Sequence, residues 1–287
     1  MQVQDKNTII ILIVLCAFES TRFEISKKVI KSINNEVNNL KNYKIFILEN
    51  GSTYNLRNSD IPFPCTLIRF DKNVGYWSAV YYFLDYLKTN QEAASYIYIV
   101  ESDNYHYNMN RLNNARQFLI DNPNINSVRT QEFIIKFKEL FSKESFLKFL
   151  GNRRSRISLI NAVTGEKAYF KKDKSINSLY ISNLHAKLPS LHRIEALRKV
   201  FVNLSSYSSF TEWNFFREMQ NLSDKIGIVD YGCYFTLSQY RNRKIIPSGS
   251  WIKEHKLYDM QYFPTRKDKI RKEELSSIMI TKHRITV

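Results

Sequence analysis

The chain has 287 residues, with 43 Lys and Arg against 27 Asp and Glu, a net charge of +16 and 44% hydrophobic residues. With only 7 Gly and 6 Pro, this is a globular composition, which excludes collagenous and disordered chains. The length suits one large α/β domain with an elaboration, or two ordinary domains. Cys16, Cys65 and Cys233 lie far apart and form no CxxC pair, which argues against a disulfide framework or a zinc knuckle and favours a reducing, cytoplasmic compartment.

The first predicted element is an apolar run at residues 8–18, TIIILIVLCAF. It is about half as long as a membrane-spanning helix, and its flanks lack the basic segment and the cleavage site of a signal peptide. Its β-branched residues favour a buried parallel strand. Shorter apolar runs at 43–48, 66–70 and 96–100 also predict buried strands.

Helical periodicity separates these strands. The segment 22–40 places Ile25, Val29 and Ile33 on one face, and the segment 76–87 repeats the pattern before the fourth strand. The alternation predicts an α/β fold with a mostly parallel, Rossmann-like sheet flanked by helices and joined by right-handed crossovers. Ligands of such sheets bind beyond the carboxyl ends of the strands.

The second half predicts further helices at 109–121, 131–150, 190–201 and 211–221 and short strands at 226–229 and 233–237. A hairpin is predicted around Thr164-Gly165-Glu166. The segment 131–150 is amphipathic with a basic face, which fits a core-packing helix or one at a membrane surface. We predict one domain at 1–238, with halves at 1–130 and 131–238, and a basic C-terminal extension at 239–287.

Two segments carry most of the net charge. Residues 136–175 have 11 basic and 4 acidic groups, and residues 239–287 have 12 and 5, whereas residues 1–135 and 176–238 each have a net charge of +1. Such basic patches fit surfaces that meet an anionic partner, such as lipid head groups, nucleic acid or acidic glycans. Solvated faces that keep the protein soluble are the alternative interpretation.

Polar or glycine-containing segments follow all four predicted strands of the first half, and the shared strand edge is expected to bring them together. The segments are Ala17-Phe18-Glu19, Glu49-Asn50-Gly51-Ser52, Asn73-Val74-Gly75-Tyr76 and Glu101-Ser102-Asp103. In extended backbone, residues i and i+2 point the same way, so Glu101 and Asp103 present two carboxylates to a hard cation such as Mn²⁺ or Mg²⁺. Taken singly, each segment also fits an ordinary turn or a hydrated loop.

As an ordered set, these motifs resemble the nucleotide-sugar glycosyltransferases with the GT-A fold, in particular the large family 2 of inverting enzymes, over roughly residues 8–238. In that family a D-N-x-S-like turn touches the base, an N-x-G loop lies against the nucleotide and a D-x-D-like motif holds the metal. The resemblance implies a metal site at Asp103 and Glu101. It implies nucleotide-sugar binding by Ala17, Phe18, Glu19, Glu49, Asn50, Ser52, Asn73, Gly75, Tyr76, Glu101 and Ser102. In this chain Glu replaces the first Asp of both acidic motifs, which changes their reach.

The resemblance continues in the second half, where the family has an arginine-bearing helix and then an acidic helix start that supplies the catalytic base. It implies that Arg193 binds the acceptor and that Glu212 is the base, although a helix-terminal acid that complements the helix dipole is the alternative. Trp213 replaces the second acid of many members and is interpreted as an acceptor platform or as a core residue. His106 and His255 are weaker candidates for an additional metal ligand.

The resemblance therefore implies a metal-dependent glycosyltransferase that moves a sugar from a nucleotide-diphosphate donor, with UDP favoured, to a hydroxyl of a glycan or lipid-linked acceptor in polysaccharide biosynthesis, with inversion. The expected location is cytoplasmic, peripheral at the inner face of the membrane through the basic patches, with no nucleic-acid partner. Two alternatives stay open: a nucleic-acid-associated protein built on a nucleotide-binding sheet, and a catalytically degenerate transferase that binds donor without turnover, motivated by Trp213.

Overall fold

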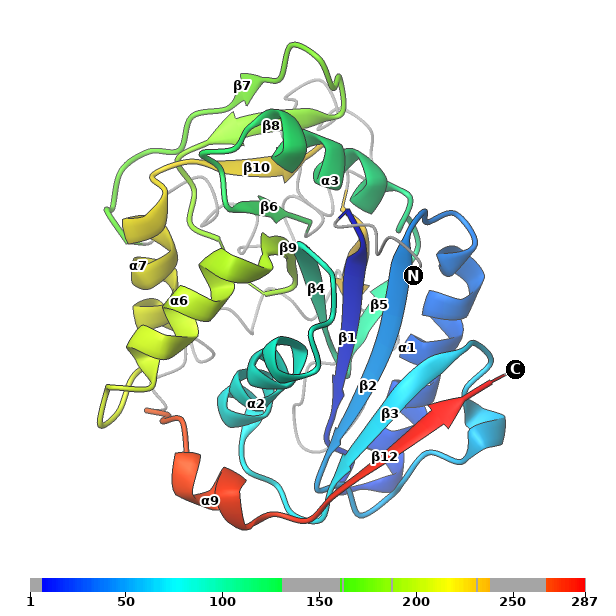
Figure 1. The fold of residues 1–287 in the computed structure, drawn as a ribbon. Helices are drawn as coiled ribbons and strands as arrows, with labels where there is room; N and C mark the ends of the chain where they lie inside the picture. Colours follow the sequence, from blue (N-terminus) through cyan, green and yellow to red (C-terminus); the bar gives the residue numbers. More distant parts are fainter. Residues whose placement is uncertain are drawn as a thin grey trace.

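A computed structural model describes residues 7–130, 161, 163–186, 188–230, 232–237 and 267–286. In these residues helices cover both faces of a ten-stranded sheet (Figure 1). The predicted α/β fold class is confirmed. Within the described ranges, no helix combines the length and the apolar character needed to cross a bilayer.

The elements carry the labels of Figure 1. The strands are β1 (Ile9–Leu15), β2 (Tyr43–Asn50), β3 (Cys65–Phe70), β4 (Tyr96–Glu101), β5 (Asn104–His106), β6 (Ser127–Arg129), β7 (Lys171–Lys172), β8 (Leu179–Ser182), β9 (Ser190–Arg193), β10 (Ile226–Val229), β11 (Tyr234–Thr236) and β12 (Ile280–Ile285). The helices are α1 (Ser20–Val37), a 3₁₀ turn at Asn58–Asp60, α2 (Tyr76–Thr89), α3 (Arg111–Asp121), α6 (Ile194–Leu204), α7 (Glu212–Leu222) and α9 (Lys272–Ser277).

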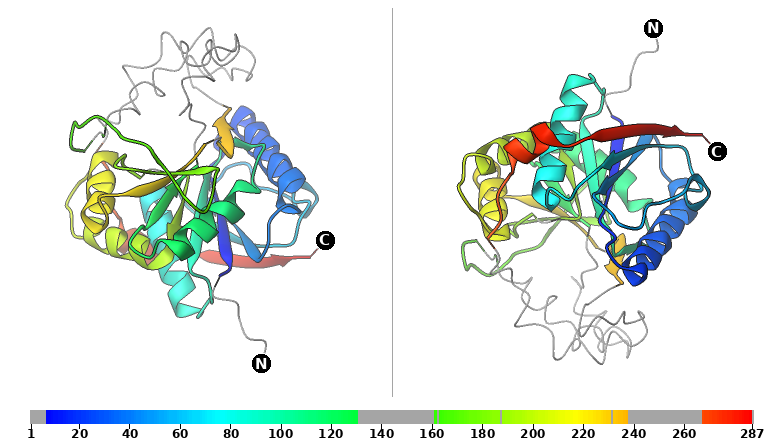
Figure 2. Two further views of the ribbon diagram at one scale, coloured as in Figure 1. Left: turned by 90° about the horizontal axis from the view of Figure 1, so that it is seen from above. Right: turned by 90° about the horizontal axis from the view of Figure 1, so that it is seen from below.

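The parallel part of the sheet has the order β3-β2-β1-β4, so β1 pairs in parallel with both β2 and β4. All seven residues of β1 are buried, because its odd-numbered side chains pack with α1 and α3 and its even-numbered side chains pack with α2, α6 and α7. Figure 2 shows these helices on opposite sides of the sheet. A strand covered on both faces reads as a continuous apolar run, which is why the first prediction succeeded.

The prediction of a helix over 190–201 is wrong at its start. Ser190–Arg193 form β9, which pairs antiparallel with both β4 and β6, and helix α6 begins at Ile194. Leu191 and His192 are completely buried, so their backbone polar groups need partners within the protein. The sheet supplies those partners on both sides of β9.

The predicted strand at 233–237 is confirmed as β11. It does not join the main sheet, and instead pairs antiparallel with β5 in a separate two-stranded sheet. The pairing places Thr236 opposite Asn104, next to the end of β4. The C-terminal half of the chain therefore supports the segment that follows β4.

The last described part of the predicted basic extension belongs to the main sheet. Residues 280–285 form β12, which pairs antiparallel with β3 along six residues and lies beside it in Figure 1. A domain that ended at the predicted boundary, residue 238, would lack β12, the strand next to β3 at the edge of the main sheet. The helix predicted at 131–150 lies outside the described residues.

The hairpin predicted around Gly165 is described only in part. Its turn is present: Asn161 donates its backbone N–H to the Glu166 carbonyl over 2.8 Å, and Gly165 donates to the Asn161 carbonyl over 2.7 Å. Gly165 has φ +74°, a conformation that glycine adopts without strain. Among the described residues no strand flanks this turn directly, and the nearby pairing joins β7 to β8.

Candidate functional site

The candidate site lies at the carboxyl edge of the parallel strands, where the segments after β1, β2 and β3 cross one another. The backbone N–H of Ala17 donates to the Ser52 hydroxyl over 3.0 Å, and the Ala17 carbonyl accepts from the N–H groups of Thr53 and Tyr54. Ala17 is 2% exposed. These bonds hold the segment after β1 against the turn after β2, which places two of the predicted nucleotide-binding segments side by side.

A pair of asparagines joins the turn after β2 to the loop after β3. Asn50 donates its amide to Asn73 Oδ1 over 3.1 Å, while Asn50 Oδ1 accepts from the Val74 N–H over 3.0 Å. Asn73 Oδ1 also accepts from the Gly75 N–H over 2.7 Å. The buried Asn50 side chain is thus engaged in hydrogen bonds that hold the two loops together, whereas Asn73 is exposed at the surface of the site.

Gly51 allows this crossing. It has φ +61°, and a Cβ at this position would lie only 2.1 Å from the backbone nitrogen of Asn73. Any side chain would force the two loops apart. Glycine in the E-N-G-S motif is therefore required by a close approach of two backbones.

Glu49 is predicted to touch the nucleotide, and the structure places it in the protein interior. Its side chain is 2% exposed and forms an ion pair with Arg69 of β3. Its second carboxylate oxygen accepts from the backbone N–H of Leu56 over 2.7 Å, and Arg69 donates to the Leu56 carbonyl. We assign Glu49 to the support of the 51–56 loop.

Two aromatic side chains are exposed at this edge. Phe18, predicted to bind the nucleotide, is 49% exposed, and Tyr54 of the adjacent loop is 42% exposed. Glu19, also a predicted contact, is exposed and is the residue before helix α1. Exposed rings next to a binding edge are available to stack on a planar ligand.

The Glu101-Ser102-Asp103 segment is a turn, which corrects the extended backbone assumed for it. Glu101 ends β4, Ser102 and Asp103 form the turn, and β5 starts at Asn104. The buried Asn104 side chain closes the turn by accepting from the Glu101 N–H over 2.9 Å. The Asp103 carbonyl accepts from the Leu237 N–H over 2.7 Å. The two acids are half-buried and held by β5 and β11.

These two acids and the predicted base, Glu212, lie near enough to act electrostatically on the hydroxyl of Tyr76, the first residue of α2. Burial of that hydroxyl, together with the nearby carboxylates of Glu101, Glu212 and Asp103, raises the pKa of Tyr76 well above its usual value. Three acids from two distant parts of the chain thus act on one point. This convergence is the central feature of the candidate site.

Glu212 is the first residue of α7, and its position is set by the residues before it. Thr211 is the N-cap, and its backbone N–H donates to Asn214 Oδ1 over 2.8 Å. Trp213, the other predicted residue of this helix start, is half-buried and packs edge-on against Phe216 with ring centroids 5.5 Å apart. Its packing supports the core interpretation offered for it.

Arg193, for which the resemblance implies acceptor binding, lies at the opposite edge of the sheet from Glu101. Arg193 pairs with Tyr96 at the start of β4, the end opposite Glu101. Its guanidinium donates to the carbonyl oxygens of Leu119 and Asn122 at the end of α3, where a cation favourably complements the helix dipole.

His106, considered as an additional metal ligand, is buried in the protein interior. It is 1% exposed, its Nε2 lies 3.1 Å from the Tyr98 hydroxyl, and burial lowers its pKa to about 3. His255, the other histidine considered as a ligand, lies outside the described residues.

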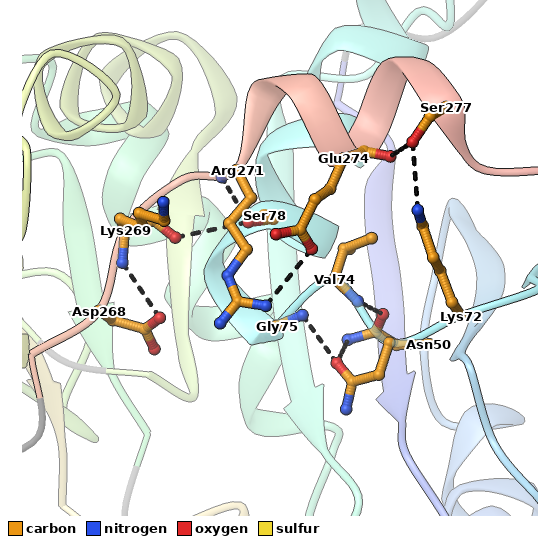
Figure 3. Close-up of polar contacts among 11 residues, drawn as sticks. Asn50, Lys72, Val74, Gly75, Ser78, Asp268, Lys269, Arg271, Glu274 and Ser277 are labelled. Atoms are coloured by element: carbon orange, nitrogen blue, oxygen red, sulfur yellow. Dashed lines mark hydrogen bonds and ion pairs between the residues drawn. The ribbon is translucent and has the colours of Figure 1, made fainter.

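The segment 267–277 covers the loop after β3 (Figure 3). The Arg271 N–H donates to the Ser78 hydroxyl over 2.9 Å, and Lys72 donates to the Ser277 hydroxyl over 3.1 Å. Asp268 and Phe210 exchange two backbone hydrogen bonds of 2.6 and 2.8 Å. This segment therefore ties the loop after β3 to the residue that precedes the start of α7.

Sequence reasoning missed two residues near the site. Tyr234 of β11 contributes to the raised pKa of Tyr76, and the pairing of β11 with β5 brings it there. Arg129 ends β6, is 4% exposed and lies close to Tyr234, and burial lowers its pKa to about 10. Arg129 lies within the three-residue strand β6, whose sequence Ser-Val-Arg is too short and too polar to predict a strand.

The residues present fit a divalent cation that is shared with a substrate. Glu101 and Asp103 supply hard carboxylate oxygens, both near Tyr76, and Mg²⁺ is commonly held by one or two carboxylates plus substrate phosphates. Within the described part of the chain there is no group of three or more His, Cys, Asp or Glu residues that would hold a metal by themselves.

No family model and no curated protein matches the chain. Solved structures with similar folds include residues 1–349 of Staphylococcus aureus TarS, at 9% identity and a TM-score of 0.45, with 79% of this chain aligned to 59% of that one. The chain thus spans about three fifths of that structure. TarS fragments were also solved with UDP and with UDP-GlcNAc.

Glucosyl-3-phosphoglycerate synthase from Mycobacterium tuberculosis, solved with Mn²⁺, UDP-glucose and phosphoglyceric acid, aligns with 86% of this chain and 77% of its own at 12% identity and a TM-score of 0.45. A CMP-2-keto-3-deoxy-manno-octonic acid synthetase solved with CTP gives 10% identity, a TM-score of 0.47 and coverages of 79% and 91%. Each bound ligand belongs to the protein that holds it.

Proposed function

We propose that the protein is a glycosyltransferase that moves a sugar from a nucleotide-diphosphate donor, with UDP favoured, to a hydroxyl of a glycan or lipid-linked acceptor. The observation that carries the proposal is the convergence of Glu101, Asp103 and Glu212 near the Tyr76 hydroxyl, beside the crossed loops after β1, β2 and β3. Two acids at a strand end and one at a helix start provide separate groups for donor and acceptor.

On the donor side, the exposed surface at Phe18 and Asn73 receives the nucleotide, while Ala17, Ser52 and Asn50 hold the loops that form it. Glu101 and Asp103 would hold Mn²⁺ or Mg²⁺ against the diphosphate. When bound, such a cation offsets the negative charge that develops on the leaving diphosphate.

On the acceptor side, Glu212 accepts the proton of the acceptor hydroxyl while that oxygen attacks the anomeric carbon opposite the leaving group, which gives inversion. Glu212 is half-buried at the N-terminus of α7. The donor-side acids also act on Tyr76, which supports a reacting centre near this tyrosine.

The test is a thermal-shift and calorimetry panel of UDP, GDP, CDP, TDP and CMP, each with and without Mn²⁺, on wild type and Asp103→Ala. A ligand that binds only the folded state raises the melting temperature by mass action, so the acceptor need not be known. We expect metal-dependent stabilisation by one nucleoside diphosphate, lost in Asp103→Ala. The absence of a response from wild type to every nucleotide would refute the proposal.

A catalytically degenerate donor-binding protein is the second candidate, and the packing of Trp213 in place of a second acid is the observation that favours it. Glu212→Gln separates the two. Loss of sugar transfer with donor binding retained assigns the base to Glu212. Donor binding by wild type without turnover on any glycan acceptor supports the degenerate protein.

A further inference from the structure

The hydroxyl oxygen of Tyr76 is buried and has no hydrogen-bond partner among the described residues. Buried tyrosine hydroxyls usually find a partner, and a native protein retains an unsatisfied one at a cost that requires an explanation. A ligand that supplies the missing partner is one such explanation.

The start of helix α2, which carries this hydroxyl, packs against the region around the start of α7. Tyr76 begins α2, and the next residue, Trp77, packs against Phe210 and Phe215 with ring centroids 5.5 and 5.3 Å apart. Phe210 lies just before the start of α7, and Phe215 belongs to that helix. The beginning of α2 is thereby held against the helix that carries Glu212.

The surroundings of the hydroxyl select the chemistry of its partner. Glu101, Asp103 and Glu212 all lie close enough to act on it electrostatically. Ionised carboxylates only accept hydrogen bonds, so a group that lies between them and the Tyr76 hydroxyl needs a proton to donate, which a fully ionised phosphate lacks. A neutral alcohol both accepts and donates, so it is able to accept from the Tyr76 hydroxyl and donate to one of the carboxylates.

We propose that the Tyr76 hydroxyl donates a hydrogen bond to a hydroxyl group of the sugar being transferred. This inference rests on the proposed function and adds a substrate contact between the donor-side acids and the base. It makes Tyr76 a determinant of how the sugar is recognised, separate from recognition of the nucleotide.

The experiment compares Tyr76→Phe, which removes only the hydroxyl, with Tyr82→Phe on the same helix, whose ring packs edge-on against Phe70. Calorimetry in the presence of Mn²⁺ measures binding of UDP, UDP-glucose and UDP-GlcNAc to both variants and to wild type. In Tyr76→Phe we expect unchanged UDP binding and about tenfold weaker binding of at least one UDP-sugar, the typical effect of one lost hydrogen bond. The melting temperature of ligand-free Tyr76→Phe should equal or exceed that of wild type, because no internal hydrogen bond is lost. Tyr82→Phe should bind all three ligands as wild type does.

The outcomes distinguish a failure of the sugar contact from a failure of the proposed function. If wild type binds UDP and a UDP-sugar, and Tyr76→Phe binds them in the same ratio, the sugar contact is refuted while the proposed function stands. A fall in the melting temperature of Tyr76→Phe without a change in that ratio assigns the hydroxyl a structural role and also refutes the contact. If wild type binds none of the three ligands, the proposed function fails and this inference fails with it.

Discussion

Replacing Gly51 by alanine tests the close crossing of the loops after β2 and β3. Gly51 has φ +61°, where an L-residue is strained by about 1 to 2 kcal/mol. The added Cβ would lie 2.1 Å from the backbone nitrogen of Asn73 and 2.2 Å from the carbonyl carbon of Lys72. Because optimal separations between non-bonded atoms are about 3.5 to 4 Å, the backbone of one loop must shift by more than about 1 Å.

Such a shift also breaks the hydrogen bonds that join the Asn50 side chain to Asn73 and to the Val74 N–H, each of which contributes about 1 kcal/mol. We therefore expect Gly51→Ala to lower the free energy of unfolding by about 3 to 4 kcal/mol. Gly165→Ala is the matched control, because Gly165 has φ +74° but no atom lies within 4 Å of the position that its Cβ would take. Its cost should be limited to the strain of about 1 to 2 kcal/mol.

Equilibrium urea unfolding of wild type and both glycine variants measures these differences, with the slope m checked for each. Binding of UDP with Mn²⁺ then reports on the site, and Gly51→Ala is expected to bind it more weakly than Gly165→Ala. Equal destabilisation by the two substitutions would refute the reasoning, because it would show that the loops do not approach as closely as described.

Three further predictions concern stability. Glu49→Gln should lower the free energy of unfolding by about 3 kcal/mol, because it leaves the partly buried Arg69 cation without its charge partner, and adding Arg69→Met should recover part of that loss in the same urea assay. Burial lowers the pKa of His192 to about 3 from about 6.5 in the unfolded chain, so only the unfolded state binds this proton between those values and stability falls as pH decreases from 6.5 to 3. His192→Asn should therefore reduce the slope of unfolding free energy against pH by about 1.4 kcal/mol per pH unit between pH 4 and 6. The control His283→Asn, at an exposed position, should leave this slope unchanged. Equal slopes for the two variants would contradict the lowered pKa of His192. Ser78→Ala should speed hydrogen exchange of the amide that its hydroxyl accepts from in the 267–277 segment, whereas unchanged exchange would show that this bond does not hold the segment down.

The parallel half of the fold was predictable because its signals are local and strong. The strand at 8–18 and the helices at 22–40 and 76–87 are each specified by their own apolar patterns, and the structure contains β1, α1 and α2 at these places. Their alternation also predicted the shared carboxyl edge, which brought Ala17, Ser52 and Asn73 into contact with the neighbouring segments.

The site was predictable in its general place and not in its individual roles. A polar residue after a strand is visible in the sequence, but the direction of its side chain depends on neighbours from other strands. Glu49 turns inward because Arg69 is beside it in the sheet. Arg193 faces away from the site because the strand that carries it runs antiparallel to β4, and no local pattern reveals that direction.

Composition and periodicity by themselves determined the α/β class, the buried first strand and the order of the edge segments, because each depends on the burial of side chains within a single short stretch. Only the tertiary structure decided that 190–193 is a strand, that 280–285 closes the edge of the sheet and that Glu212 meets Glu101 and Asp103 at Tyr76. Those features depend on backbone hydrogen bonds and charges between residues that lie far apart in the sequence, and such pairings leave no periodic trace in the chain.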